Sequence, residues 1–304
     1  MRIRPRLLAL GMAPLLLLAL GCAPVDSSTP DAGEDPSESS GPTDSTSASA
    51  EADPAACAAE AVRSPGTLTI GTDSPAYEPW FSKNDPTNGE GFESAVAYAV
   101  AEQLGFTGDA VQWTKVPFNS SYAPGEKKFD FDINQISITP ERAEVVDFSD
   151  GYYQAAQAVI VLKGSAGEDV TSVAELQGLR LGAQTGTTSL TAIRDVIQPD
   201  TDPVVFKDTS AAKQALLNDQ VDAILADLPT AFYITAVEIP KATIVGQFQP
   251  ETGEQEEFGM LFEKGSPLVE CVNQALTILR DDGTLASIES RWLSDVVGVP
   301  ELTP

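Results

Sequence analysis

The sequence predicts an α/β fold made of two lobes, and three observations support this prediction. Strand-like and helix-like patterns alternate along most of the chain, which is typical of sheets covered by helices. Two stretches, residues 152–157 and 255–262, are expected to carry the chain from one lobe to the other and back. A length of 304 residues with 42% hydrophobic content suffices for one large or two medium-sized domains.

The individual elements follow from local patterns. The stretch 91–105 is predicted to be a helix, because its apolar residues recur at helical spacing and Gly105 stands where a residue after a helix would. We expect Glu93, near the start of this helix, to have a capping role. The other expected strands and helices are residues 67–73, 110–116, 129–134, 158–162, 210–217, 221–227, 267–280 and 285–297, and residues 178–189 are expected to form a strand, a glycine turn and the start of a helix.

Composition excludes several classes of function. The formal net charge of −27 leaves no basic stripe for nucleic acid. The sequence contains no histidine. Ser-His-Asp and Cys-His catalysis and histidine-bearing metal centres are therefore excluded, and neither a metal nor a cofactor is expected.

The first residues have the pattern of a secretion signal. Arginines between positions 2 and 6 precede an apolar run at residues 7–20 that is too short for a comfortable membrane span. The run ends at Cys22 in a sequence resembling a lipoprotein cleavage box, although Ala19 stands where leucine is usual. We predict that residues 1–22 are a lipoprotein signal peptide and that Cys22 is lipidated; simple cleavage is the alternative.

Residues 23–56 are rich in Ser, Thr, Pro and acidic residues and contain neither basic nor aromatic side chains. Such a segment buries too little apolar surface to offset its conformational entropy, so a disordered tether is predicted. The expected domain limits are 57–155 for the first part of lobe one, 156–254 for lobe two, and 255–304 for the return to lobe one.

Two further cysteines, Cys57 and Cys271, form an even pair in an exported chain. We predict a disulfide that joins the start of the folded region to a C-terminal helix. Two buried free thiols are the alternative.

A short helix is predicted to begin with Thr139 as its N-cap, followed by proline. Arg142 then falls in the first turn, where the helix dipole disfavours a cation. A bound anion shared with the guanidinium would explain this position. The alternative is an exposed ion pair with Glu141 or Asp147.

The motifs S-I-T-P-E-R (residues 137–142) and V-D-F-S-x-x-Y-Y (residues 146–153) resemble the signature of family 3 extracellular solute-binding proteins. The resemblance covers residues 66–297. It implies a bilobal periplasmic-binding-protein-like (type II) fold, two α/β lobes joined by a two-strand hinge. It also implies a monomer, held at the extracellular face of the membrane by a lipid anchor, that delivers an amino acid to an ABC permease and its ATPase.

The resemblance also implies which residues bind the ligand. In the first lobe, Asp73 matches the family's acid at a strand end, and Tyr77 and Trp80 match its aromatic residues; a core position is the alternative for Trp80. Phe118 is the next aromatic candidate, with Asn119 as the alternative because the register is uncertain by one residue.

Ser137 and Arg142 complete the first-lobe site, and Arg142 corresponds to the arginine that clamps the ligand α-carboxylate. In the second lobe, Thr187 and Thr188 match a G-T-T motif that completes the carboxylate site, with helix capping as the alternative for both. Asp227 matches the acid that binds the α-ammonium, and its alternative role is also a helix cap.

The predicted function is capture of an amino acid between two lobes, with closure of the hinge when both charged ends are bound. Asp73, Gln135 and Gln184 favour a polar or basic side chain. Two alternatives remain: a cyclohexadienyl-dehydratase-like lyase on the same fold, and an amino-acid-sensing module.

Overall fold

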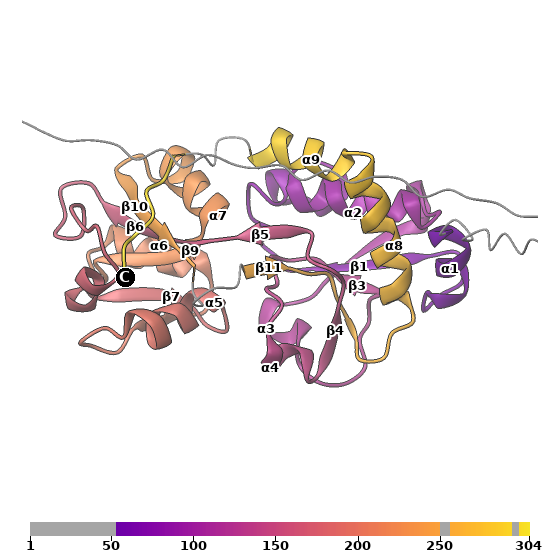
Figure 1. Cartoon of the computed structure of the whole chain (residues 1–304), viewed down its shortest axis with the longest axis horizontal. Helices are drawn as coiled ribbons and strands as arrows, with labels where there is room; N and C mark the ends of the chain where they lie inside the picture. Colours follow the sequence, from indigo (N-terminus) through magenta and orange to yellow (C-terminus); the bar gives the residue numbers. More distant parts are fainter. Residues whose placement is uncertain (1–52, 250–255, 294–297) are drawn as a thin grey trace, which may run out of the picture. The chain divides into compact units, whose positions relative to one another are not determined.

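The structure is a computed structural model, and it describes residues 53–249, 256–293 and 298–304. These residues form two five-stranded sheets and one two-stranded ribbon, with helices packed on the sheets (Figure 1). Each sheet with its helices is called a lobe below. The predicted signal peptide, the lipidation site Cys22 and the tether up to residue 52 lie outside the described residues.

The first lobe is built on a sheet with strand order β2-β1-β3-β12-β4. Strand β1 runs parallel to both β2 and β3, whereas β12 is antiparallel to β3 and β4. The strands are β1 (Leu68–Thr72), β2 (Val111–Lys115), β3 (Phe131–Asp132), β4 (Val146–Phe148) and β12 (Leu261–Glu263).

Three helices of the first lobe lie together on one side of its sheet (Figure 1). Apolar residues of β1 and β3, such as Ile70 and Phe131, share one fully buried core with Phe92 and Val96 from the first of these helices and Leu276 from the second. The helices are α2 (Phe92–Gln103), α8 (Leu268–Asp281) and α9 (Thr284–Leu293); α3 (Phe118–Ser121) and α4 (Pro140–Ala143) are single turns nearer the cavity described below.

The second lobe has strand order β10-β6-β9-β7-β8. Strand β7 is parallel to β8 and β9, and β6 is antiparallel to β9 and β10. The strands are β6 (Gln157–Leu162), β7 (Leu181–Gln184), β8 (Val204–Phe206), β9 (Ala223–Asp227) and β10 (Ala242–Phe248), and the helices are α5 (Thr188–Thr191), α6 (Thr209–Leu217) and α7 (Leu228–Tyr233).

Short helical turns complete both lobes. Two segments of π-helix continue α5 and α7. These segments are Ala192–Ile197 and Ile234–Glu238, and the 3-10 turns are Ser82–Asn84, Pro86–Asn88, Gly108–Ala110 and Ala174–Gly178.

The two lobes are joined by the ribbon of β5 (Tyr153–Ala155) and β11 (Glu256–Phe258), which pair antiparallel. Figure 1 shows this ribbon between the two sheets. The predicted two-strand hinge is confirmed.

The N-terminal edge of the folded region begins earlier than predicted. Helix α1 (Pro54–Ala61) is capped by the carboxylate of Asp53, which accepts a hydrogen bond of 3.0 Å from the backbone N–H of Ala56. Residues 53–56, which we assigned to the tether, are therefore ordered, because the cap and a disulfide fix them. This disulfide joins Cys57 to Cys271 of α8, as predicted, with 5.5 Å between the two Cα atoms.

The C-terminal residues 298–304 differ from the predicted domain limits, because they pack on the second lobe. Glu301 pairs with Gln247 of β10, and Thr303 pairs with Ser172. Leu302 is 7% exposed and fills the space over Gly246, where any larger residue would collide with it. An apolar side chain at the chain end thus completes the core of lobe two.

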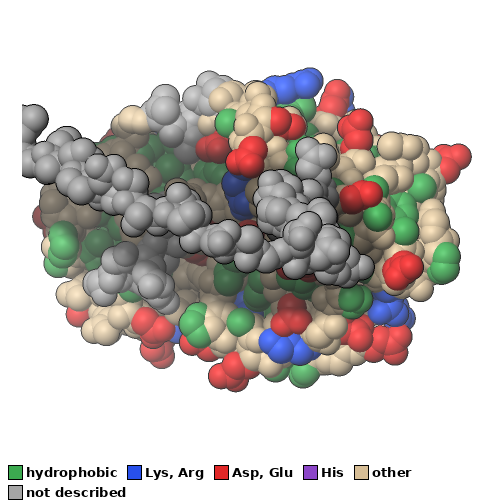
Figure 2. All heavy atoms as spheres, turned by 45° about the vertical axis from the view of Figure 1, so that its right-hand side comes forward, with side chains coloured by type: hydrophobic (Ala, Val, Ile, Leu, Met, Phe, Trp, Pro, Cys, Tyr) green, Lys and Arg blue, Asp and Glu red, His purple; other side chains and the backbone are tan. Residues whose placement is uncertain are grey.

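The surface is strongly acidic. Figure 2 shows Asp and Glu side chains spread over one face of the molecule with few basic side chains between them. Among the described residues, no helix is long and apolar enough to cross a membrane.

Candidate functional site

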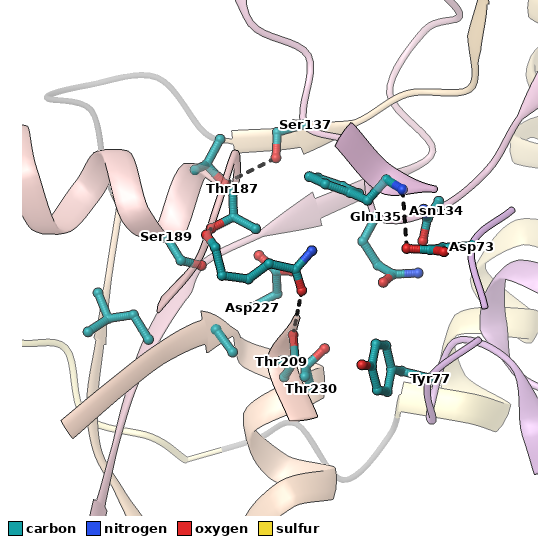
Figure 3. A pocket seen from close by; sticks show the side chains of 15 residues that line it. Asp73, Tyr77, Asn134, Gln135, Ser137, Thr187, Ser189, Thr209, Asp227 and Thr230 are labelled. Atoms are coloured by element: carbon teal, nitrogen blue, oxygen red, sulfur yellow. Dashed lines mark hydrogen bonds between the residues drawn. The ribbon is translucent and has the colours of Figure 1, made fainter. Parts of the chain in front are cut away.

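A cavity of about 60 Å³ lies where loops at the carboxyl ends of the parallel strands of both lobes meet. Open α/β sheets bind ligands at this edge. Its lining is mostly polar (Figure 3). The lining residues are Asp73, Tyr77, Phe118, Asn134, Gln135, Ser137, Gln184, Thr187, Thr188, Ser189, Thr209, Leu225, Ala226, Asp227 and Thr230.

The cavity brings together nine of the predicted ligand residues. They are Asp73, Tyr77, Phe118, Gln135, Ser137, Gln184, Thr187, Thr188 and Asp227. The prediction omitted four polar lining residues, and strand ends are the signal that could have found two of them. Asn134 follows β3, and Thr209 begins α6 directly after the loop from β8; the other two are Ser189 and Thr230.

Asp73 ties two loops of the first lobe together. Its carboxylate accepts hydrogen bonds from the backbone N–H groups of Ser74 at 2.6 Å and of Phe118 at 3.1 Å. Phe118 therefore lies on the cavity wall in the register that we predicted, and Asn119 is turned elsewhere to accept a hydrogen bond from Tyr122.

Tyr77 crosses toward the second lobe. Its hydroxyl lies 3.3 Å from the hydroxyl of Ser210, and Lys213 sits over its ring at 5.4 Å from the centroid. Burial raises the pKa of Tyr77 above its ordinary value. The neutral phenol is thus an aromatic wall with one polar end.

Trp80 is a core residue, and the ligand-facing role that we predicted for it is wrong. Its side chain is fully buried and packs edge-on against Phe92, Tyr153 and Phe258. The indole N–H donates to the hydroxyl of Thr230 in the second lobe at 2.8 Å. Trp80 therefore does not line the cavity but supports its wall.

Arg142 occupies the predicted helix turn, because the hydroxyl of Thr139 accepts from its backbone N–H and caps α4. The guanidinium donates to the carbonyl of Ser137 at 2.6 Å and to the carbonyl of Gly186 in the second lobe at 2.9 Å. The central guanidinium carbon, Cζ, also lies 4.9 Å from the ring centroid of Tyr122.

The exposed ion pair that we considered for Arg142 does not form. The side chain is 8% exposed, and Asp147 pairs instead with Lys264 at 2.8 Å. Burial lowers the pKa of Arg142 from its ordinary value, although nearby acids oppose the shift. Arg142 lines the groove next to the cavity rather than the cavity itself, so only part of its donor set is open to a ligand.

The glycine turn of the second lobe approaches the first lobe closely. Gly186 has a φ of +76°, and an added Cβ there would meet Asn119 and Tyr122. Thr187 is the N-cap of α5, since its hydroxyl accepts from the backbone N–H of Leu190 at 3.2 Å. Capping thus holds for Thr187, whereas the hydroxyl of Thr188 faces the network described next.

Asp227 ends β9 and is the N-cap residue of α7 by position, but its carboxylate makes no capping bond. It accepts from the side-chain amide of Gln157 at 3.1 Å. Burial, and then the nearby charge of Glu256, hold the pKa of Asp227 well above its usual range.

Glu256 and Gln157 on the crossing segments are site residues that the prediction missed. The Glu256 carboxylate accepts from the hydroxyls of Ser137 and Thr188, both at 2.5 Å, and from the amide of Gln157 at 3.0 Å. Gln157, at the start of β6, also bonds Asp227 within the second lobe. Glu256 of the hinge strand β11 therefore connects the two lobes at the site. The sequence offers no signal that singles out these two residues, because Gln154 and Glu257 are further polar residues on the same segments.

Metal binding finds no support in the described part of the chain. Within residues 53–249, 256–293 and 298–304, no three His, Cys, Asp or Glu side chains are placed to hold a metal ion. Hydroxyls, amides and two acids can instead hold a small polar molecule through hydrogen bonds and charge.

Two α/β lobes, a two-strand hinge and a polar cavity between them define a solute-binding protein. Residues 68–295 match the family of bacterial extracellular solute-binding proteins, family 3, and the chain belongs to this family.

Similar proteins fit this assignment. The L-cystine-binding protein TcyJ of Escherichia coli is 27% identical over 234 residues, which cover 76% of this chain and 84% of TcyJ. The solved structure of an ancestral arginine-binding protein bound to glutamine is 33% identical, with a TM-score of 0.64 and coverage of 75% of this chain and 98% of the other.

A third relative bears on the enzyme alternative. The ancestral amino acid-binding protein AncCDT-1, a precursor of cyclohexadienyl dehydratase, is 30% identical with a TM-score of 0.62, covering 75% of this chain and 95% of its own. Relatives of this chain carry the names of binding proteins, and the chain is a solute-binding protein rather than an enzyme.

Proposed function

We propose that this protein is the substrate-binding component of an ABC importer, and that it captures a polar or basic amino acid between its two lobes. The observation that carries the proposal is the placement of Arg142 of the first lobe in the groove and of Asp227 of the second lobe in the adjoining cavity. The hydroxyl residues Ser137, Thr187 and Thr188 line both spaces. A zwitterion offers a carboxylate to Arg142 and an ammonium to Asp227.

The charge of the site supports the choice of side chain. The cavity lining contains two carboxylates, Asp73 and Asp227, and no lysine or arginine. If Asp227 binds the α-ammonium, Asp73 is left to face the ligand side chain. Acids that line a cavity without a cationic partner favour a positively charged ligand group, so a basic side chain fits best. Relatives are named for binding arginine, histidine, glutamine and cystine.

The size of the cavity supports entry by hinge motion. A volume of about 60 Å³ has room for roughly four to six waters, taking about 10–15 Å³ for each. Side-chain contacts close the lobes over it, among them those of Tyr77 with Ser210, Trp80 with Thr230, and Arg142 with Gly186. A ligand that enters the open form and touches both lobes stabilises the closed form by its differential affinity.

Anchoring and delivery are part of the same proposal. Cys22 carries lipid and holds the protein at the extracellular face of the membrane, and residues 23–52 tether it there. The closed lobes then dock as a monomer on the permease of the importer.

A thermal-shift screen of the twenty amino acids, L-ornithine and L-cystine tests the ligand class. A ligand that binds only the folded state raises the melting temperature, and at one hundred times its Kd it adds about 2.7 kcal/mol of stability. We expect L-arginine, L-lysine or L-ornithine to give the largest shift. No shift with any amino acid would refute the proposed ligand class, and a largest shift with an acidic amino acid would refute the assignment of Asp73.

A further inference from the structure

The capping role that we expect for Glu93 from the sequence is not the one it has in the structure. The N-cap of α2 is Gly91, which makes no side-chain capping bond. The Glu93 carboxylate is fully buried and accepts three hydrogen bonds. The donors are the backbone N–H of Gln135 at 2.6 Å, the side-chain Nε2 of Gln135, and the hydroxyl of Tyr152 next to the hinge strand β5.

Gln135 is a cavity residue in an unusual conformation. Its φ of +48° lies in the left-handed region, which costs a residue other than glycine on the order of 1 kcal/mol or more and persists only where surrounding contacts enforce it. The two bonds to Glu93 supply such contacts. Figure 3 shows Gln135 beside Asp73 and Asn134, across the cavity from Asp227.

The bond between Glu93 and Nε2 decides which polar atom of Gln135 remains for the cavity. An ionised carboxylate only accepts hydrogen bonds, so it holds the NH₂ end of the amide and leaves Oε1, an acceptor, for a ligand. A protonated carboxyl carries one O–H donor. Oε1 accepts from it after a half-turn of the amide, and Nε2, a donor, then faces the cavity.

We infer that Glu93 is a positioning residue that selects which end of the Gln135 amide faces the ligand cavity. An ionised Glu93 prepares the cavity for a ligand group that donates hydrogen bonds, such as a guanidinium. A neutral Glu93 prepares it for a group that accepts them. The preference for a donor or an acceptor group of the ligand rests on the proposed function, whereas the coupling between the side chains of Glu93 and Gln135 does not.

The surroundings of Glu93 allow both forms at neutral pH. The titratable groups that face it are Tyr152 beside the hinge, Asp132 on β3 and Asp227 on β9, and none of them is a cation. Burial outweighs the three hydrogen bonds and raises the pKa of Glu93 to about 7. Burial also holds the pKa of Asp132 well above its usual range.

The variant Glu93→Gln mimics the neutral form. Its Oε1 still accepts from the backbone of Gln135 and from Tyr152, and its NH₂ takes the place of the oxygen that faced the Gln135 side chain. Gln135 must then turn Oε1 toward residue 93 at every pH. Glu102→Gln, an exposed substitution on the same helix α2, is the matched control.

The first test needs no ligand. NMR of the full-length chain, labelled with nitrogen-15, follows the backbone and side-chain N–H signals of Gln135 from pH 5 to pH 9. We expect these signals to titrate with a midpoint near pH 7 in the wild type and in Glu102→Gln, and to stay constant in Glu93→Gln. Constant signals in the wild type, or the same titration in Glu93→Gln, overturn the inference.

The second test compares L-arginine with L-citrulline, in which a carbonyl oxygen replaces one nitrogen of the guanidinium and the charge is lost. Calorimetry should show that the preference for L-arginine falls about tenfold between pH 8.5 and pH 5.5 in the wild type, and that Glu93→Gln keeps the low preference at both values. An unchanged preference overturns the role in specificity. If neither amino acid binds while Gln135 still titrates, the proposed ligand class fails and the positioning of Gln135 stands.

Discussion

At the scale of single residues, the site depends on charges that are buried rather than exposed. Arg142 is 8% exposed and donates to carbonyl oxygens of both lobes, and Asp227 is held by Gln157. A buried charge without a full set of partners is costly, so a ligand that completes the set gains correspondingly more free energy.

Replacing Arg142 by alanine should weaken binding of the best amino-acid ligand by roughly thirtyfold to several thousandfold. The reason is that loss of one partner from a buried charge pair costs on the order of 2 to 5 kcal/mol. Arg142→Lys should recover only part, since an ammonium cannot reproduce the planar fork. Titration calorimetry measures both variants.

Arg280→Ala is a matched control for Arg142, because Arg280 also donates to a main-chain carbonyl, that of Gly151 at 2.6 Å, but lies on the exposed side of α8. Its affinity should stay near that of the wild type. A loss of less than tenfold in a folded Arg142→Ala protein would show that the carboxylate is bound elsewhere. Because two carbonyls lose their donor, we also expect Arg142→Ala to be about 1 to 3 kcal/mol less stable.

At the scale of elements, the two ends of the folded chain are fastened differently. Helix α1 is joined to α8 by the disulfide, within the first lobe. Residues 298–304 pair with β10 and fill a hole over Gly246 in the second lobe. Helix α9 packs in the first lobe, and residues 298–304 pack on the second. The chain therefore joins the two lobes a third time, in addition to the hinge strands β5 and β11.

Replacing Cys57 and Cys271 by serine should lower the free energy of unfolding by about 2 to 5 kcal/mol, because the disulfide closes a loop with a sequence separation of 214 residues. Chemical denaturation measures the loss. Ligand affinity should stay the same, since neither cysteine lies near the cavity. Two alkylatable thiols in the native, unreduced wild type would contradict the prediction.

At the scale of the whole molecule, several acids that face the cavity or lie behind it keep raised pKa values, namely Glu93, Asp132 and Asp227. These acids have lower pKa values in the unfolded chain than in the folded protein. At a pH between the unfolded and the folded values, the folded state therefore binds more protons than the unfolded state. By linkage, the free energy of unfolding falls as pH rises through this window.

For Glu93 the window runs from about pH 4.5 to about pH 7, and one such group contributes a slope of up to about 1.4 kcal/mol per pH unit. Glu93→Gln should make the fall in stability over this range shallower by about that amount, whereas Glu102→Gln should not. Urea denaturation at half-unit steps of pH measures both. A slope in Glu93→Gln equal to that of the wild type would show that Glu93 ionises as it does in the unfolded chain.

Attachment to the membrane is a second property of the whole molecule. Cys22→Ala, or deletion of residues 1–52 behind a cleavable secretion signal, should release the protein from the membrane fraction without changing ligand affinity. Fractionation measures release from the membrane, metabolic labelling with palmitate measures the lipid on Cys22, and calorimetry measures ligand affinity. A protein that stays with the membrane after Cys22→Ala would rule out the lipid anchor, and a large loss of affinity in the truncated chain would show that the tether contributes to the site.

The sequence alone determined the alternation of strands and helices, the two crossings, the disulfide pairing, and most of the polar residues around the cavity. These features depend on local patterns, strand ends and short motifs, which a single sequence contains. Thr139 capping the turn of Arg142 and Phe118 following its strand are examples.

Only the tertiary structure decided which side chains are buried and which atoms they meet. Trp80 and Tyr77 share one loop, yet Trp80 packs among Phe92, Tyr153 and Phe258 and Tyr77 lines the cavity. Glu93 and Gln135 are 42 residues apart, and Glu256 reaches Ser137 and Thr188 from the far hinge strand. Such pairings arise from packing between distant segments, and burial, not local propensity, sets the charges that result.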